Sequence, residues 1–433
     1  MADDSISLSF EIEKFVKLYK ISYCKLTQRI YVYDDSTGLH YPVDDIELSK
    51  LVDEFINSDE TSLDWCDYNM SMIIKYVKTK APYYESMGRK GRTVFNNATF
   101  HWKDMTVRKH SSKDRATASL GVDFDPEAEC PVFDRYISQL ANGDKNMRTT
   151  FYQIAGYVAS HSQKHSKLVL LVSQGGSGKS VYLKTLEALV GTEYTSKLSI
   201  SEINNPNRAF DRLDLLDSRL NIVHELGEKE TMNSIFSANV KKIVSGEEIS
   251  CERKFGSRTT FTPKISMIVV ASNHCPLFEG MPSESIRRRL LILNITKVLA
   301  PEEQDEMLFQ KIKAELAGVF NKAVKYYQLL KENNFVFASE ADSRAFIDNQ
   351  IIESFPMYSF VNQYIVVKPG HKLMNEILRE KYAEWAAEHD VDVTLDSKGL
   401  MKSLANTIQK CHIPFKREKS NGVRYLLGID IKN

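Results

Sequence analysis

The chain has 433 residues, 42% hydrophobic and 26% charged, which is enough apolar material for about three globular domains. Basic and acidic residues number 57 each, so the net charge gives no sign of a nucleic-acid partner. A nucleic-acid-binding site would have to come from a local cluster of basic residues. No stretch approaches the roughly 18 apolar residues of a membrane span, and the amino terminus lacks a signal-peptide layout. The six cysteines form no C-x-x-C pair, which argues against zinc or disulfides and favours reduced thiols in the cytoplasm.

The amino-terminal region, residues 1–125, mixes helical and strand patterns and gives no indication of its role. Within it, "RIYVYDDSTGLHYPV" predicts a β-hairpin, because β-branched and aromatic residues flank an Asp-Asp-Ser-Thr-Gly turn. Residues 126–165 predict a helical lead-in, with Phe133, Tyr136, Ile137 and Leu140 at helical spacing.

Strand-like apolar runs alternate with helical patterns from residue 166 to 300, which predicts an α/β core. A helical segment, 301–335, completes a central domain of residues 126–335. A last domain is expected over residues 340–433.

A glycine-rich stretch, "KLVLLVSQGGSGKSVYLKTLEALVG", opens the α/β core and predicts a strand from 167 to 172, a loop, and a helix from about Lys179. It nearly matches the phosphate-loop pattern G-x-x-x-x-G-K-(S/T), except that Ser173 stands at the first glycine. Glycines let backbone N–H groups turn inward around phosphate, and the helix N-terminus adds partial positive charge. The expected nucleotide-binding residues are Gly175, Gly176, Ser177, Gly178, Lys179, Ser180 and Val181.

This pattern predicts a nucleoside triphosphate site. Lys179 would reach the β and γ phosphates, and the Ser180 hydroxyl would bind Mg²⁺. The alternative is a flexible Gly/Ser turn, which the strand–loop–helix context disfavours.

A polar residue follows each of two further apolar strands. Glu225 follows "RLNIV", where a carboxylate can help hold Mg²⁺ and polarise the attacking water. His224 precedes it where a second acid is usual, so one carboxylate would serve both roles. Asn273 follows the run from Ile265 to Ala271, where its amide could contact the γ-phosphate or the water. Either residue alone could be structural.

Three arginines, Arg287, Arg288 and Arg289, precede another buried strand. They could form a solvated edge or include an arginine that reaches the γ-phosphate of a neighbouring subunit. Charge alone does not distinguish between these two interpretations.

The most specific run is "SGEEISCERKFGSRTTFTPKISMIVVASNHCPLF". With the features above, it resembles superfamily 3 helicases, in particular the phage and plasmid primase-helicases related to the poxvirus D5-like nucleoside triphosphatase. The residues that fit the family pattern are Ser245, Gly246, Glu248, Ile249, Glu252, Arg253, Lys254, Phe261, Pro263, Asn273, His274 and Pro276. Departures are Ser173 for glycine, His224 for a small or acidic residue, and Arg287 as an additional arginine.

The resemblance implies a P-loop AAA+-like ATPase core that forms a hexameric ring and moves on single-stranded or forked DNA with ATP and Mg²⁺. Glu225 would be the catalytic acid, Asn273 the sensor, and Arg288 or Arg289 the finger that acts in trans. Arg253, Lys254 and Phe255 would lie on a hairpin that contacts DNA. The implied setting is phage or mobile-element replication in a bacterial cytoplasm, with a separate primase or other replication protein as a further partner.

The carboxyl-terminal segment predicts helix, helix, hairpin, which resembles the winged-helix tail of this family. The first helix is expected over 372–389, with Leu373, Ile377, Tyr382 and Trp385 facing inward, and the second over 396–411. Basic residues gather on the second helix and the hairpin tip, and the expected DNA contacts are Lys402, Lys416, Arg417, Lys419 and Arg424. Protein docking and simple solvation are the alternatives.

Two functions from different classes therefore stand. One is an ATP-dependent DNA helicase. The other is an origin-binding initiator or nucleotide-switched scaffold that does not unwind processively. A P-loop kinase or transferase fits poorly, because it explains neither the Lys254 hairpin nor the basic tail.

Overall fold

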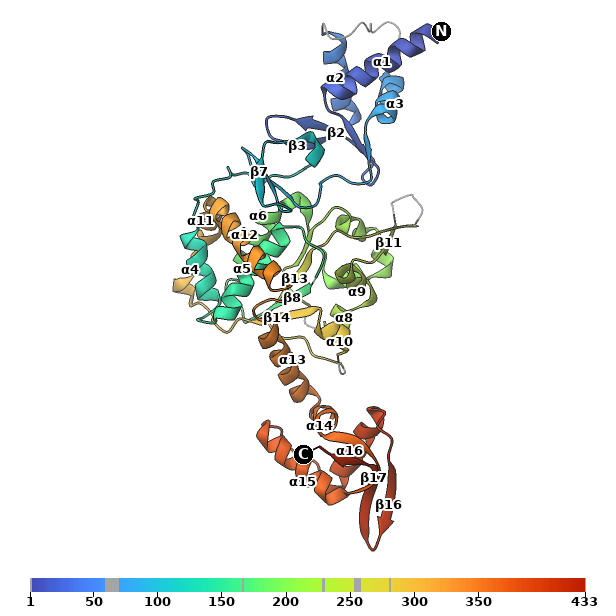
Figure 1. The fold of residues 1–433 in the computed structure, drawn as a ribbon, viewed down its shortest axis with the longest axis vertical. Helices are drawn as coiled ribbons and strands as arrows, with labels where there is room; N and C mark the ends of the chain where they lie inside the picture. The colour runs from blue at the N-terminus through green and yellow to red at the C-terminus, as the bar shows by residue number, and fades with distance from the viewer. Residues whose placement is uncertain are drawn as a thin grey trace. The chain divides into compact units, whose positions relative to one another are not determined.

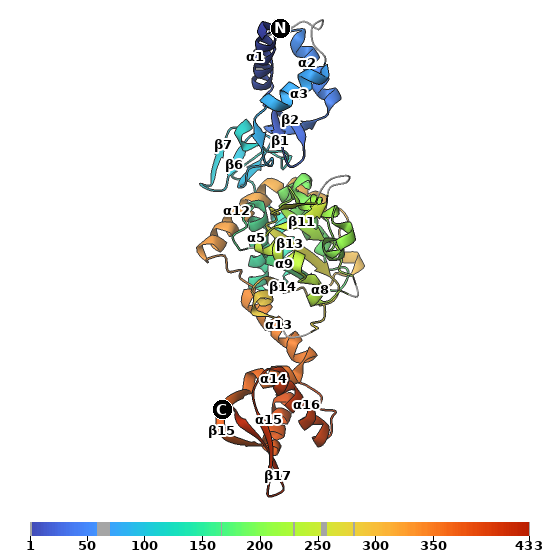
Figure 2. The ribbon, with the colours of Figure 1, turned by 90° about the vertical axis from the view of Figure 1, so that its right-hand side faces the viewer.

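The computed structural model describes residues 2–58, 70–165, 167–227, 230–252, 258–279 and 282–432. The chain forms two compact units. The first consists of Met1–Gly227, Phe236–His274 and Leu293–Ser339, and the second of Glu228–Ile235, Cys275–Ile292 and Glu340–Asn433. Figures 1 and 2 show the elements of each unit from two directions.

The amino-terminal elements are helices with two small sheets, of strand orders β3-β2-β1-β4 and β5-β6-β7. Their bounds are α1 Ala2–Leu18, β1 Ser22–Cys24, β2 Arg29–Asp34, β3 Leu39–Val43, α2 Asp45–Ile56, α3 Met70–Lys80, β4 Tyr83–Tyr84, β5 Arg92–Val94, β6 Thr99–His101 and β7 Thr106–Arg108. The expected hairpin is confirmed, since β2 and β3 pair antiparallel. A capping box between Asp44 and Glu47 begins α2.

The central part of the chain contains a five-stranded sheet of order β14-β8-β13-β10-β9. The bounds of its elements are α4 Pro131–Leu140, α5 Lys145–Ala159, β8 Lys167–Val172, α6 Lys179–Val190, β9 Thr195–Ser196, α7 Ile200–Asn204, β10 Leu220–Val223, α8 Met232–Ile235, α9 Ala238–Ser245, β11 Ile249–Glu252, β12 Arg258–Phe261, β13 Met267–Ser272, α10 Glu284–Arg287, β14 Leu290–Asn294, α11 Leu308–Ala314 and α12 Leu316–Glu332. The expected α/β class is confirmed, because the pairs β8–β13, β13–β10 and β10–β9 are parallel.

The sheet register brings the carboxyl ends of three strands to one edge. Val172, the last residue of β8, pairs with Ser272, the last of β13. Val223 at the end of β10 pairs with Val270 of β13. Every residue of these strands is buried, as expected for a parallel sheet covered on both faces. Residues that follow the three strands therefore meet at the same edge.

Helices α5 and α12 lie side by side in the first unit (Figure 1). A Cβ at Gly156 of α5 would lie 2.2 Å from the Ala323 carbonyl oxygen of α12, so this close approach requires glycine. Nearby, Phe320 of α12 meets the rings of Phe95 and Phe100 edge-on. These contacts hold α5 and the segment from 92 to 101 against α12.

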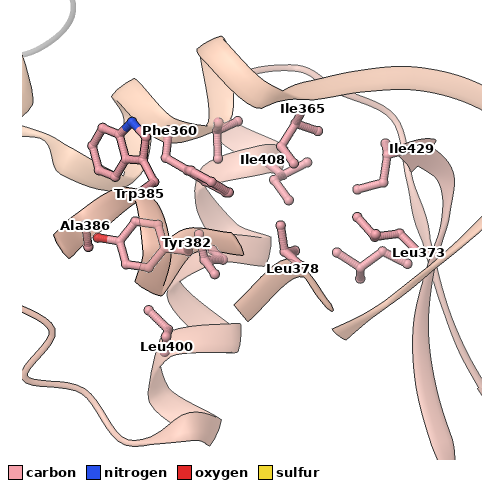
Figure 3. Close-up of a cluster of buried hydrophobic side chains, with 13 residues drawn as sticks. Phe360, Ile365, Leu373, Leu378, Tyr382, Trp385, Ala386, Leu400, Ile408 and Ile429 are labelled. Atoms are coloured by element: carbon pink, nitrogen blue, oxygen red, sulfur yellow. The ribbon is translucent and has the colours of Figure 1, made fainter. Parts of the chain in front are cut away.

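The carboxyl-terminal elements enclose their own core (Figure 3). Their bounds are α13 Glu340–Ser354, α14 Pro356–Tyr364, β15 Ile365–Met374, α15 Asn375–Glu388, α16 Ser397–Lys410, β16 Lys416–Ser420 and β17 Val423–Ile431. The strands form an antiparallel sheet of order β15-β17-β16. Phe360, Tyr382 and Trp385 form the aromatic part of the core, beside Leu404 and Ile408 of α16.

One expectation for this segment is wrong. Residues 372–374 belong to β15 rather than to the first helix, which begins at Asn375. Leu373 is buried as expected, but it projects from a strand that pairs with β17. Ile377 does not face inward, because 43% of it is exposed. The second helix and the hairpin lie where the sequence predicts them.

Candidate functional site

A pocket of about 390 Å³ lies at the carboxyl edge of the central sheet. We call it the sheet-edge pocket. Its lining residues come from the end of β13, the first turn of α6, the connections after β8, β10 and β13, and the segment after β14: Gly175, Gly176, Ser177, Gly178, Lys179, Ser180, Val181, His224, Glu225, Ala271, Ser272, Asn273, Leu299, Gln304, Asp305, Glu306 and Leu308. All seven expected nucleotide-binding residues, together with Glu225 and Asn273, are among them.

The glycine-rich loop, residues 173–178, uses glycine where its backbone needs it. Gly176 and Gly178 have φ of 80° and 96°, a region that other residues rarely adopt. Ser173, which departs from the pattern, is not among the residues with positive φ. It is buried, and its N–H donates to the Ser272 carbonyl at 3.1 Å. The serine therefore causes no backbone strain at the first position of the loop.

Two carbonyl groups of the loop are held by donors from other elements. Gly176 accepts from the Leu299 N–H at 3.3 Å. Gly178 accepts from the hydroxyl of Tyr136, in α4, at 2.9 Å. A loop that binds phosphate must turn N–H groups toward it, and its carbonyl groups then need partners elsewhere. These two contacts supply such partners.

Lys179, the first residue of α6, folds its side chain into the loop. Its ammonium group donates to the Ser173 carbonyl at 2.7 Å, to the Gln174 carbonyl at 3.2 Å and to the Asn273 side-chain oxygen at 3.4 Å. Burial lowers the pKa of Lys179, and the negative charge of Glu225 opposes this effect. The ammonium group is thus held among two backbone carbonyl oxygens of the loop and the side-chain oxygen of Asn273.

Asn273 joins Lys179 to the candidate catalytic acid. Its amide nitrogen donates to a Glu225 carboxylate oxygen at 3.2 Å, while its oxygen accepts from Lys179. Glu225 and Asn273 are both exposed to the pocket, at the ends of neighbouring parallel strands. A cation, an amide and a carboxylate therefore form one continuous polar row.

The geometry suits a triphosphate with Mg²⁺. The loop offers backbone curvature, Lys179 offers positive charge, and Ser180 lies exposed in the first turn of α6. Within the described residues, no group of three or more His, Cys, Asp or Glu side chains could hold a metal by itself. A metal with few protein ligands, shared with phosphate oxygens, is the usual mode for Mg²⁺.

The sequence gives no signal for a further side of the sheet-edge pocket, which is lined by Leu299, Gln304, Asp305, Glu306 and Leu308. Leu299 holds the loop, and the amide nitrogen of Gln304 lies 3.2 Å from where a Gly176 Cβ would be. Gln304 also donates to the Leu299 carbonyl at 3.2 Å, and Asp305 pairs with Lys311 at 2.6 Å. The segment carries no motif, and only the fold brings it over the loop.

The three arginines differ in their surroundings. Arg287 forms an ion pair with Asp348 of α13. Arg289 is partly buried and donates to the Ser285 carbonyl at 3.0 Å, within the same short turn. Arg288 is exposed. Because Arg287 pairs with Asp348 of the same unit, this additional arginine has a structural partner there.

The expected DNA-contacting hairpin is formed by β11 and β12, which pair antiparallel from Ile249–Phe261 to Glu252–Arg258. Arg253, Lys254 and Phe255 lie outside the described residues.

A second pocket of about 480 Å³ lies between α16 and the β16–β17 hairpin. We call it the basic groove. It is lined by Asn375, Lys398, Met401, Lys402, Ala405, Arg417, Glu418, Lys419, Arg424, Tyr425 and Leu426. Four of the five DNA contacts expected in the carboxyl-terminal segment, Lys402, Arg417, Lys419 and Arg424, therefore meet in one groove. Lys416 is exposed on β16 and does not line it.

In the described part of the chain, no helix is both long and apolar enough to cross a bilayer.

Two family models match the chain. One, described as "D5 N terminal like", matches residues 13–140, which include most of the region whose role the sequence left open. The other, a family of unknown function (DUF5906), matches residues 171–289, which contain the glycine-rich loop, Glu225 and Asn273.

A curated viral protein and several solved structures are also similar. "Putative helicase 121R" of Invertebrate iridescent virus 3 is 20% identical over 235 residues. The match covers 51% of this chain and 24% of that protein, so the chain spans only about a quarter of its relative. Apo structures of the NrS-1 C-terminal region are 12% identical, with TM-scores of 0.51 and 0.52. They cover 95% and 96% of this chain, and 98% and 99% of their own chains, and so share its fold.

The D5-like model over residues 13–140 and the helicase-named viral relative support the assignment of this chain to the D5-like primase-helicase family.

Proposed function

We propose that the chain is an ATP-dependent DNA helicase of phage or mobile-element replication that moves as a ring on single-stranded DNA. The observation that carries this proposal is the polar row from Lys179 through Asn273 to Glu225 beside the glycine-rich loop. Hydrolysis needs a cation for the phosphates, an acid for the water and a group that senses the γ-phosphate. The row places all three residue types at one sheet edge.

Each residue has a role in this proposal. The loop N–H groups and Lys179 bind the β and γ phosphates, and Glu225 orients and polarises the attacking water. Asn273 reports the state of the γ-phosphate, because its amide contacts both Lys179 and Glu225. Mg²⁺, held by Ser180 and directly or through water by Glu225, would neutralise charge on the phosphates. Binding of phosphate would draw Lys179 away from the Ser173 carbonyl and alter the row.

A neighbouring subunit completes the site in this proposal. Arg288 or Arg289 would reach the γ-phosphate in trans and stabilise the charge of the transition state. Arg288 is the stronger candidate, because it is exposed whereas Arg289 is partly buried.

The carboxyl-terminal elements serve as a winged-helix DNA-binding domain in this proposal. Five basic side chains line the basic groove: Lys398, Lys402, Arg417, Lys419 and Arg424. Such a cluster neutralises backbone phosphates, and Tyr425 provides an aromatic surface in the same groove. Arg253, Lys254 and Phe255 remain proposed contacts to the translocating strand.

The second candidate is an origin-binding initiator or scaffold, which the basic groove favours. The two candidates differ in which DNA stimulates ATP hydrolysis. A helicase should hydrolyse ATP faster with single-stranded DNA of any sequence. An initiator should respond instead to one specific duplex. ATPase rates with single-stranded DNA, with random duplex and without DNA decide between them, because only a helicase should hydrolyse ATP faster with single-stranded DNA of arbitrary sequence.

A further inference from the structure

Tyr136 is a buried tyrosine of α4 that touches the glycine-rich loop. It is 4% exposed, and its hydroxyl donates to the Gly178 carbonyl at 2.9 Å. One of its ring carbons lies 3.3 Å from where a Gly178 Cβ would be, so the ring packs directly against this glycine. Burial raises the pKa of Tyr136, which keeps the hydroxyl protonated and able to donate.

The carbonyl that Tyr136 holds belongs to the peptide that joins Gly178 to Lys179. A peptide unit is planar, with its C=O and N–H pointing in opposite directions. Fixing the Gly178 carbonyl therefore fixes the direction of the Lys179 N–H. That N–H is one of the unpaired donors at the start of α6, the group of donors that binds phosphate at helix N-termini.

The Gly178 carbonyl has other, local partners. It accepts from the Val181 N–H at 3.0 Å and from the Tyr182 N–H at 3.4 Å, both within the first turn of α6. Residue 178 is a glycine with φ of 96°, and because glycine has no side chain, this peptide is freer to rotate than it would be at another residue. Tyr136 adds the donor that comes from outside the turn.

Helix α4 is itself held in place. The Glu315 carboxylate accepts from the N–H groups of Val132 and Phe133, at 3.0 and 3.2 Å, at the start of the helix. Asp134 pairs with Lys322 of α12 at 2.7 Å and accepts from the Tyr152 hydroxyl at 2.7 Å. The support for Tyr136 thus extends from α5 and α12, outside the sheet-edge pocket.

We propose that Tyr136 is a positioning residue for nucleotide binding, which orients the peptide between Gly178 and Lys179 so that its N–H faces the phosphates. This inference rests on the proposed function, because it requires that the glycine-rich loop bind a nucleotide. Tyr136 contacts no reacting atom and acts only through the loop.

Tyr182 offers a matched control. It is also a buried tyrosine, and its hydroxyl donates to a backbone carbonyl, that of Phe151 in α5, at 2.7 Å. Removing either hydroxyl costs one buried hydrogen bond to a carbonyl. Only the Tyr136 hydroxyl touches the loop.

The experiment compares Tyr136→Phe and Tyr182→Phe in the full chain. It measures Mg-ADP affinity by calorimetry, KM and kcat for ATP, and melting temperature. We expect Tyr136→Phe to raise both Kd and KM about 3- to 10-fold, the effect of one hydrogen bond, with kcat little changed. Tyr182→Phe should lower the melting temperature about as much as Tyr136→Phe does, but leave Kd unchanged.

Equal Kd values for the two variants would overturn the positioning role of Tyr136, because loss of a buried hydroxyl would then act only on stability. A wild-type chain that binds no Mg-ADP would instead overturn the proposed function. The two failures are therefore distinguishable.

Discussion

The side-chain amide of Asn273 donates to the carboxylate of Glu225 at 3.2 Å, across the ends of two neighbouring parallel strands. Its oxygen simultaneously accepts from Lys179 at 3.4 Å. A side-chain amide can donate to an acid through its nitrogen and accept from a cation through its oxygen at the same time. The candidate acid and the candidate phosphate-binding cation are thus connected through one residue.

Glu225→Gln should separate binding from hydrolysis. The amide cannot polarise water as a carboxylate does, so we expect kcat to fall by roughly 10²- to 10⁴-fold while ATP still binds. Steady-state ATPase rates and nucleotide affinity test this. Glu306→Gln, which removes an acid from another wall of the sheet-edge pocket, is the control and should retain most of the activity. Equal losses in both variants would contradict the role of Glu225.

Arg288→Ala should abolish hydrolysis and leave nucleotide binding intact, because the arginine would act on the neighbouring subunit. Mixing it with Lys179→Ala should restore part of the ATPase activity. In mixed rings, some interfaces combine an intact loop from one subunit with an intact arginine from the other. No recovery on mixing would argue against a site shared between subunits.

Arg287→Ala is the control for this mixing experiment. Because Arg287 pairs with Asp348 within its own unit, its loss should lower stability slightly and preserve hydrolysis.

Lys402→Ala should weaken DNA binding, because Lys402 lines the basic groove. Removing one phosphate contact should reduce the slope of log K against log salt by about 0.7 for single-stranded DNA. Lys410→Ala is a matched control. It lies exposed on the same helix, α16, but does not line the groove. Binding titrations at several salt concentrations test this, and equal slopes for the two variants would speak against a DNA contact in the groove.

His40 predicts a loss of stability in acid. Burial, and secondarily the charge of Arg115, lowers its pKa from 6.5 to about 4. Between these values the unfolded chain binds a proton that the folded chain does not, so the free energy of unfolding falls as pH falls. By pH 5 the loss from this group is up to about 2 kcal/mol.

His40→Phe should flatten this pH dependence, and it keeps a ring beside Tyr33. Melting temperatures at pH 7.5 and pH 5 measure the difference. An equal fall in wild type and variant would exclude His40 as the acid-sensitive group.

The central site could be predicted because its parts have local signals. The glycine-rich loop is one contiguous motif, and Glu225 and Asn273 each follow an apolar run. Carboxyl ends of parallel strands meet at one edge, so strand pattern alone brings such residues together. Tyr136 had no such signal. It was visible only as a core position of a helix, and its partner Gly178 lies 42 residues away.

The wrong helix start in the carboxyl-terminal segment also has a physical reason. Met374 at the N-cap of α15 makes no side-chain cap hydrogen bond, so no capping residue indicates where the helix begins. The strand Ile365–Met374 is defined by pairing with β17, more than fifty residues later in the chain. Tertiary pairing, not local sequence, decides that Leu373 belongs to a strand.

The most direct test of the central claim is unwinding of a forked DNA duplex with ATP and Mg²⁺ by wild type and Lys179→Ala. We expect the wild type to separate the strands and the variant to fail, because the variant lacks the cation for the β and γ phosphates. If neither protein unwinds the duplex while the wild type still hydrolyses ATP, the helicase proposal for this chain is contradicted. The hypothesis of an origin-binding initiator, which the basic groove favours, then takes its place.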